Sequence, residues 1–134
     1  MATSLAPQVV VFLYSESAEK HAVLNLKKEK FMINLALSPR ADLNFREVRA
    51  IPSSVSAALA STPAVTVLHI SSHGNTNGLR FEETYGATSH EVTKEELRVY
   101  IERCRPQLLV LAACNSLELG KFACTLAVPH VIAS

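Results

Sequence analysis

A cysteine and a histidine in this sequence each follow a strongly apolar segment, and together they could perform nucleophilic chemistry. Cys114 follows Leu-Leu-Val-Leu-Ala-Ala, and His73 follows Val-Thr-Val-Leu-His-Ile-Ser-Ser. The run before Cys114 predicts a central parallel strand, buried on both faces, that gives way to a helix. Unpaired backbone N–H groups at the start of a helix carry partial positive charge, which favours the thiolate form of a nearby cysteine. An imidazole within reach would supply the base, so the pair predicts a Cys–His site.

The elements that must position this pair alternate between strand and helix along the chain. Apolar runs predict strands over Gln8–Tyr14, Val65–Gly74, Leu108–Ala113 and His130–Ala133, and a run of mixed charged and apolar residues predicts one over Leu43–Ile51. Helical spacing of apolar residues predicts helices that begin near Leu24, at Ser53 or Ser54, at Thr93 and before Leu119. Such alternation is typical of an α/β fold in which a parallel sheet carries helices on both faces.

The predicted strand order puts the two reactive residues side by side. The polar strand 43–51 suits an edge, followed by the strands that begin near Val9, Val65 and Leu108. Chemistry in such sheets gathers at the carboxyl ends of the strands. Neighbouring strands lie about 4.8 Å apart, so the imidazole of His73 and the thiol of Cys114 can approach each other.

Each reactive residue also has an ordinary structural interpretation. Cys114 alone could be an inert buried cysteine, and His73 alone could be a turn residue that bonds a carbonyl. His69 is expected to pack in or beside the core, and Asn115 and Ser116 are expected to cap the helix after Cys114. Other residues predicted to lack a chemical role are Cys104 and Cys124, on apolar helical faces, and Glu82, Glu83 and Glu91, in a solvated loop.

Composition limits the classes of function. A chain of 134 residues with 49% apolar and 19% charged residues predicts one globular domain. Its formal charge of +1 and lack of a basic block argue against nucleic-acid or membrane partners. Three cysteines without CxxC spacing predict neither a disulfide framework nor a metal site, and a reducing cytoplasm is the expected compartment. No glycine-rich phosphate loop follows the first strand, which disfavours a flavodoxin-like binding domain, and no cofactor is expected.

Three segments in the second half of the chain carry a family resemblance. They read His-Ile-Ser-Ser-His-Gly at 69–74, Gly-Leu-Arg-Phe-Glu at 78–82 and Leu-Val-Leu-Ala-Ala-Cys-Asn-Ser at 109–116. They resemble CHAT domains, which belong to the caspase-like cysteine peptidases of clan CD. The likeness runs from Val9 to the end of the sequence, and includes Leu-Asn-Leu at 24–26 with Glu29 and Val-Pro-His-Val-Ile at 128–132. The His-Gly and Ala-Cys-x-Ser motifs are specific as a pair.

The resemblance implies a single caspase-like domain over residues 1–134, a three-layer sandwich with a mostly parallel sheet. It implies that His73 is the catalytic histidine and Cys114 the nucleophile, with the backbone N–H groups of Gly74 and Cys114 as oxyanion donors. Cleavage of a peptide or protein substrate by a thiolate and an imidazole agrees with the chemistry of the pair.

Two departures from the family pattern leave a second class of function open. Ala112 stands where caspases carry glutamine and metacaspases carry aspartate, so the preferred substrate side chain does not carry over. The family also continues into C-terminal strands that form the other wall of the substrate groove, beyond the last residues here. We therefore expect the chain to need a C-terminal half or a partner chain, or to self-associate. The alternative is a catalytically silent caspase-like module that scaffolds or regulates a partner.

Overall fold

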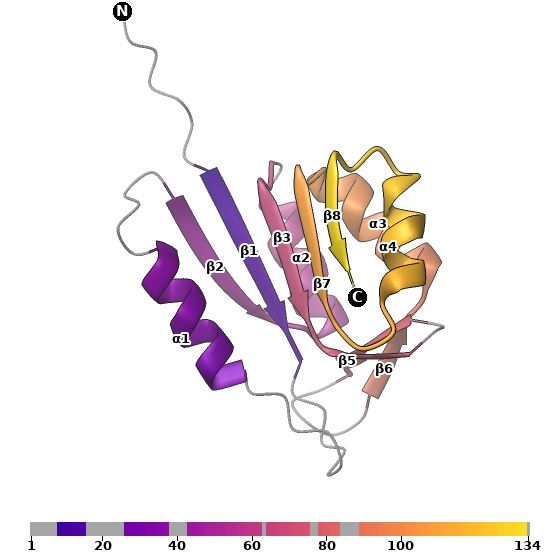
Figure 1. Ribbon diagram of the computed structural model, residues 1–134, viewed down its shortest axis with the longest axis horizontal. Coiled ribbons are helices and arrows are strands. Elements are labelled where there is room, and N and C mark those ends of the chain that lie inside the picture. Colours follow the sequence, from indigo (N-terminus) through magenta and orange to yellow (C-terminus); the bar gives the residue numbers. More distant parts are fainter. Residues whose placement is uncertain are drawn as a thin grey trace, which may run out of the picture.

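Parallel strands form the central sheet of this computed structural model, which describes residues 8–15, 26–37, 43–62, 64–75, 78–83 and 89–133 (Figure 1). In these residues the sheet has five strands in the order β2-β1-β3-β7-β8, and every neighbouring pair is parallel. The strands are β1 (Gln8–Tyr14), β2 (Leu43–Arg49), β3 (Val67–Ser71), β7 (Leu108–Ala112) and β8 (His130–Ala133). This confirms the predicted α/β class and the predicted strand order.

Helices lie on both faces of the sheet, as the alternation predicts. They are α1 (Leu26–Leu37), α2 (Pro52–Ala60), α3 (Lys94–Cys104) and α4 (Leu117–Cys124). Figure 1 shows α1 in front of β1 and β2, with α2 and α3 behind the sheet. Right-handed crossovers explain the division, because the chain moves from β1 to β2 in one direction and then from β2 through β3 and β7 to β8 in the other. The result is a three-layer α/β sandwich.

Most of the apolar core lies between the sheet and α2, α3 and α4. Leu109 and Leu111 of β7 belong to this core and are buried, whereas Leu108 and Val110 between them are only half-buried. The prediction that this strand is buried on both faces is therefore wrong. Among the described residues only α1 covers the second face, and it lies over the β1 and β2 side of the sheet (Figure 1).

A second, smaller sheet lies at the carboxyl edge of the large one. Its antiparallel strands are β4 (His73–Asn75), β5 (Gly78–Glu82) and β6 (Ser89–Val92). The predicted strand over 65–74 is thus wrong at both ends, because β3 spans Val67–Ser71 and His73 opens a new strand. Within the small sheet, β4 and β5 pair with Asn75 opposite Gly78. The apolar side chains Leu79, Phe81 and Val92 are buried and extend the core of the large sheet.

Two helix starts compare directly with the sequence patterns. Thr93 caps α3, since its hydroxyl accepts a hydrogen bond from the backbone N–H of Glu96 at 3.4 Å. The cap predicted at Ser53 or Ser54 is wrong, because α2 begins at Pro52 with Ile51 in the N-cap position. Proline suits that first helical position, since its fixed φ is already helical and no N–H is lost there.

None of the helices in the described ranges has the length and apolarity needed to cross a membrane.

Candidate active site

The pairing of β3 with β7 brings the segments that carry His73 and Cys114 to one edge. The ladder ends with Ser71 opposite Ala112, and the N–H of Ser72 still donates to the carbonyl of Ala112 at 3.4 Å. His73 lies two residues beyond Ser71, and Cys114 lies two residues beyond Ala112. Both therefore leave neighbouring strands at the same carboxyl edge, where the sequence places them.

Gly74 makes the closest approach between the two segments. A Cβ atom at this position would lie 2.7 Å from the carbonyl oxygen of Cys114 and 3.1 Å from the Cβ of Ala113. Real Cβ atoms do not come that close to a backbone oxygen, so the contact requires glycine at this position. The backbone after His73 therefore lies directly against the backbone of Cys114.

A tight turn presents Cys114 to solvent before α4 begins. Cys114 is exposed, and Asn115 after it has a φ of 56°, in the left-handed region that asparagine tolerates better than most residues. The hydroxyl of Ser116 donates to the carbonyl of Leu111 at 3.2 Å and makes no cap hydrogen bond to α4. Ser116 occupies the predicted N-cap position of α4, but its buried hydroxyl bonds the turn back to β7 and makes no cap hydrogen bond to the helix.

A carboxylate that sequence reasoning did not single out as functional lies close to this edge. Glu29, in the first turn of α1, accepts hydrogen bonds from Ser71 Oγ at 2.8 Å and contacts His69 Nε2 at 2.9 Å. The ring of His69 also packs edge-on against Phe12, with centroids 5.1 Å apart, which agrees with its predicted place beside the core. The signal for this cluster is the spacing of His69 and Ser71, since alternate residues of a strand share a face.

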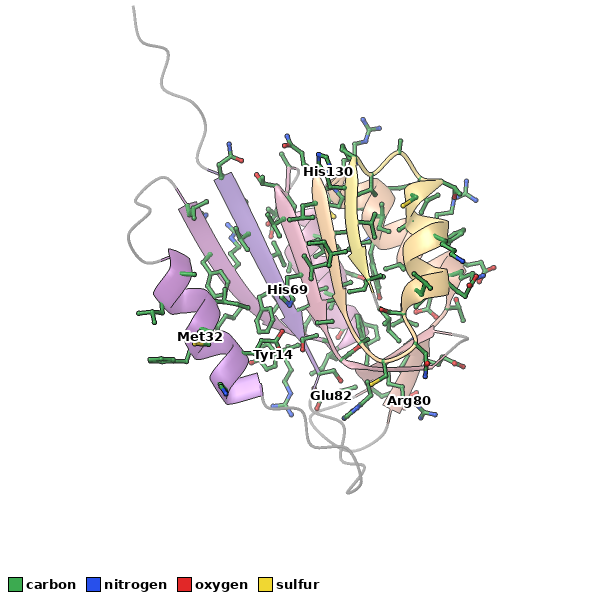
Figure 2. All side chains as sticks on the ribbon, in the orientation of Figure 1. Tyr14, Met32, His69, Arg80, Glu82 and His130 are labelled. Carbon is green, nitrogen blue, oxygen red and sulfur yellow. The ribbon has the colours of Figure 1, made fainter. Side chains whose placement is uncertain are left out.

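A buried ion pair fixes the small sheet to the large one. Both oxygens of Glu82 accept hydrogen bonds from the guanidinium of Arg49, at 2.8 and 2.9 Å, and the side chain of Glu82 is 1% exposed. The N–H of Glu82 also donates to the carbonyl of Ala50 at 2.9 Å. The predicted solvated loop is therefore wrong for Glu82, although Glu83 and Glu91 are exposed. Figure 2 shows Glu82 and Arg80 at the lower edge of the molecule, opposite His130.

The other two cysteines differ from Cys114 and from each other. Cys104 is fully buried at the end of α3, and burial raises the pKa of its thiol to about 12. It is held as a neutral thiol, as expected for an inert core cysteine. Cys124 ends α4 and is exposed, so the prediction that it lies on an apolar face is wrong. It supplies an accessible thiol on the helix that follows Cys114.

A cavity of about 600 Å³ opens at the opposite edge of the sheet, away from both reactive residues. It lies between the carboxyl ends of α3 and α4 and is lined by Ile101, Glu102, Arg105, Pro106, Gln107, Leu126, Ala127, Val128 and Pro129. This lining includes no cysteine, histidine or serine, so the cavity offers no nucleophile or general base. The reactive side chains of His73 and Cys114 and the cavity therefore lie at opposite edges of the sheet.

The described residues contain no group of three His, Cys, Asp or Glu side chains arranged to hold a metal ion. Neither models of known protein families nor characterised proteins give a match to this chain.

Proposed function

We propose that the chain is a caspase-like cysteine endopeptidase, or the part of one that carries the catalytic dyad. The proposal assigns Cys114 as the nucleophile and His73 as the acid and base. Its strongest support is the contact between Gly74 and the carbonyl of Cys114, since this contact holds the residue after the histidine against the residue that carries the thiol.

The proposed reaction begins with attack of the Cys114 thiolate on a peptide carbonyl. The carbonyl oxygen becomes an oxyanion, which the backbone N–H groups of Gly74 and Cys114 stabilise. The imidazolium of His73 then protonates the leaving amine, and the acyl group stays on sulfur as a thioester. A water molecule, deprotonated by His73, attacks the thioester and expels the Cys114 thiolate; the acid product loses its proton to solvent, and the thiolate and the His73 imidazolium are restored.

Alkylation by iodoacetamide tests the dyad without needing a substrate. We expect Cys114 to react at least about tenfold faster than exposed Cys124 at pH 6. The proposed dyad supplies a thiolate at Cys114, whereas few molecules of an ordinary thiol are ionised at that pH. The His73→Ala variant should slow Cys114 to the rate of Cys124. His90→Ala is the matched control, since His90 is half-buried in β6 and its ring contacts Glu96 at 2.7 Å. Peptide mass spectrometry measures each rate.

Equally slow alkylation of Cys114 and Cys124 in the unmodified chain would contradict the peptidase and favour the alternative function. In that alternative, the chain is a silent caspase-like module that scaffolds or regulates a partner. The observation that favours it is the position of β8, which pairs with β7 on one side and is the outermost strand among the described residues. Its alternate residues His130 and Ile132 are exposed, and strand edges of this kind accept a strand from another chain.

A further inference from the structure

The cavity at the amino edge of the sheet has an apolar floor. Ile101 of α3 and Val128 after α4 line it and are 2% and 7% exposed. Its volume of about 600 Å³ lies in the range that small-molecule sites occupy. Backbone hydrogen bonds hold one wall, since the N–H of Gln107 donates to the carbonyl of Thr66 at 3.0 Å and the carbonyl of Gln107 accepts from the N–H of His130 at 3.1 Å. The floor and this wall are therefore fixed by the fold itself.

Two side chains of opposite charge lie on the rim of this cavity. Glu102 belongs to the last turn of α3 and Arg105 follows that helix, and both are exposed. The carboxylate of Glu102 pairs with Arg98 at 2.9 Å on the outer surface of α3. Within the described part of the chain, no ion pair engages the guanidinium of Arg105. The rim therefore offers a cation and, three residues away, a carboxylate whose surface ion pair holds it only weakly.

The carboxyl ends of α3 and α4 meet at this cavity and add partial negative charge to it. Leu126 and Ala127 follow α4 and line the cavity, as Arg105 does after α3. The last carbonyls of a helix have no partner inside that helix, and the aligned peptide dipoles favour a cation at this end. An ammonium group is therefore favoured between the helix ends and Glu102, whereas a carboxylate is favoured only beside Arg105.

Left-handed backbone is concentrated around the same cavity. Three non-glycine residues in the described ranges have this conformation, and two of them, Arg105 with a φ of 44° and Ala127 with a φ of 61°, line the cavity. Glycine commonly fills such positions after a helix, because other residues are strained there. Strained residues cluster at binding and catalytic sites. The third is Asn115, next to Cys114, so the cavity shares this feature with the proposed catalytic edge.

We propose that this cavity binds a free amino acid with an apolar side chain. The α-carboxylate forms charge-assisted hydrogen bonds with Arg105, the α-ammonium lies between Glu102 and the helix carbonyls, and the side chain covers the apolar floor. Both charges of an amino acid are attached to one carbon, which suits a basic and an acidic residue three positions apart. The site is separate from the edge that carries Cys114, so this inference does not depend on the proposed peptidase function.

Four ligands separate the contributions to binding on the full chain. They are L-leucine, L-leucinamide without the carboxylate, N-acetyl-L-leucine without the ammonium, and glycine without the side chain. Titrations followed by backbone amide NMR shifts measure each dissociation constant and locate the perturbed residues, which should be those that line the cavity. We expect L-leucine to bind at least roughly tenfold more tightly than each of the others, because one hydrogen bond to a charged group or one buried leucine side chain supplies about that factor.

Arg105→Gln removes the cation and keeps a long polar side chain on the rim. In this variant the dissociation constants of L-leucine and L-leucinamide should become about equal, because the preference for the carboxylate is lost. Arg103→Gln is the matched control, since Arg103 is exposed in the last turn of α3 and does not line the cavity. It should keep the preference of the unmodified chain. If Arg105→Gln does not fold, the four ligands on the unmodified chain still decide the outcome.

A preference for L-leucine that is lost in Arg105→Gln and kept in Arg103→Gln supports the inference. Equal binding of L-leucine and L-leucinamide by the unmodified chain overturns it, and so does the absence of saturable binding of L-leucine. N-acetyl-L-leucine that binds as tightly as L-leucine also overturns it, since the cavity would then take any apolar carboxylate, such as the carboxyl terminus of a peptide. Shifts confined to the residues around Cys114 would place the ligand elsewhere and overturn the assignment to this cavity.

Discussion

The two ends of the central sheet contrast in what they hold. The carboxyl edge has an exposed cysteine, a half-buried histidine, a glycine pressed against the cysteine backbone and a second small sheet. The amino edge has the cavity of about 600 Å³ and, beside it, the buried Cys104 at the end of α3. The cavity and the reactive side chains therefore lie at opposite edges of the sheet. The reactive side chains lie where parallel strands end, whereas the cavity lies between the carboxyl ends of α3 and α4.

The two thiols express the same contrast chemically. Cys104 is surrounded by apolar side chains that raise its pKa to about 12 and keep it neutral. Cys114 is presented to solvent by a turn with Asn115 in the left-handed region. The two exposures differ because Cys114 lies in a turn after a parallel strand, whereas Cys104 lies on the face of α3 that packs on the core.

The largest effect is expected from adding a side chain at Gly74, at the carboxyl edge of the sheet. Gly74→Ala would push a methyl group against the carbonyl of Cys114, since the Cβ position is 2.7 Å from that oxygen. We expect about 1–3 kcal/mol of lost stability from overpacking, and alkylation of Cys114 slowed to the rate of Cys124. Urea unfolding and iodoacetamide labelling measure the two effects.

Gly120→Ala is the matched comparison for this change. A Cβ at Gly120 would lie 2.6 Å from the Cβ of Ala133, so this variant is also overpacked, but between α4 and β8. It should lose a similar amount of stability while Cys114 keeps its rapid alkylation. If both glycine variants change the labelling equally, general loosening of the fold explains the result, and the special role of Gly74 is wrong.

An intermediate effect is expected from pH at the amino edge. The pKa of Cys104 is raised by burial from 9.0 to about 12, so the unfolded chain releases this proton first as the pH increases. Stability from this thiol is complete below pH 9 and is lost progressively between pH 9 and 12. At pH 10 the loss is about 1.4 kcal/mol for one such group.

Cys104→Ala isolates this contribution from other alkaline titrations, such as that of Tyr100, whose pKa burial also raises. The unmodified chain should lose about 1.4 kcal/mol more than the variant when urea unfolding at pH 7 is compared with pH 10. Identical losses in the two proteins would mean that Cys104 is not kept neutral by the core.

The smallest effect is expected at Ala127, which lines the cavity with a φ of 61°. A left-handed backbone costs an alanine about 1 kcal/mol that glycine avoids. Ala127→Gly should therefore raise the free energy of unfolding by somewhat less than about 1 kcal/mol, since glycine also gains freedom in the unfolded chain. Thermal denaturation measures the change, and alkylation of Cys114 should not respond. A loss of stability would show that the backbone there is not strained.

Local patterns in the sequence determined the strands of the large sheet and the edge at which His73 and Cys114 lie. The segments at 8–14, 43–49, 67–71, 108–112 and 130–133 are strands because apolar residues recur there between turn formers. Their order follows from alternation with helices and from the charged residues that place 43–49 at an edge. The positions of His73 and Cys114 at one edge followed from the same rule, since parallel strands end together.

Tertiary structure alone decided which surroundings those residues have. The sequence could not show that the strand before His73 ends at Ser71 and that His73 opens a second sheet, because pairing with Gly78–Glu82 competes with continuation of β3. Glu29 and Ser71 are 42 residues apart in the sequence, and no local period of the sequence encodes a contact over that separation. Glu82 is buried because Arg49 reaches it from β2, a compensation that only the folded chain supplies.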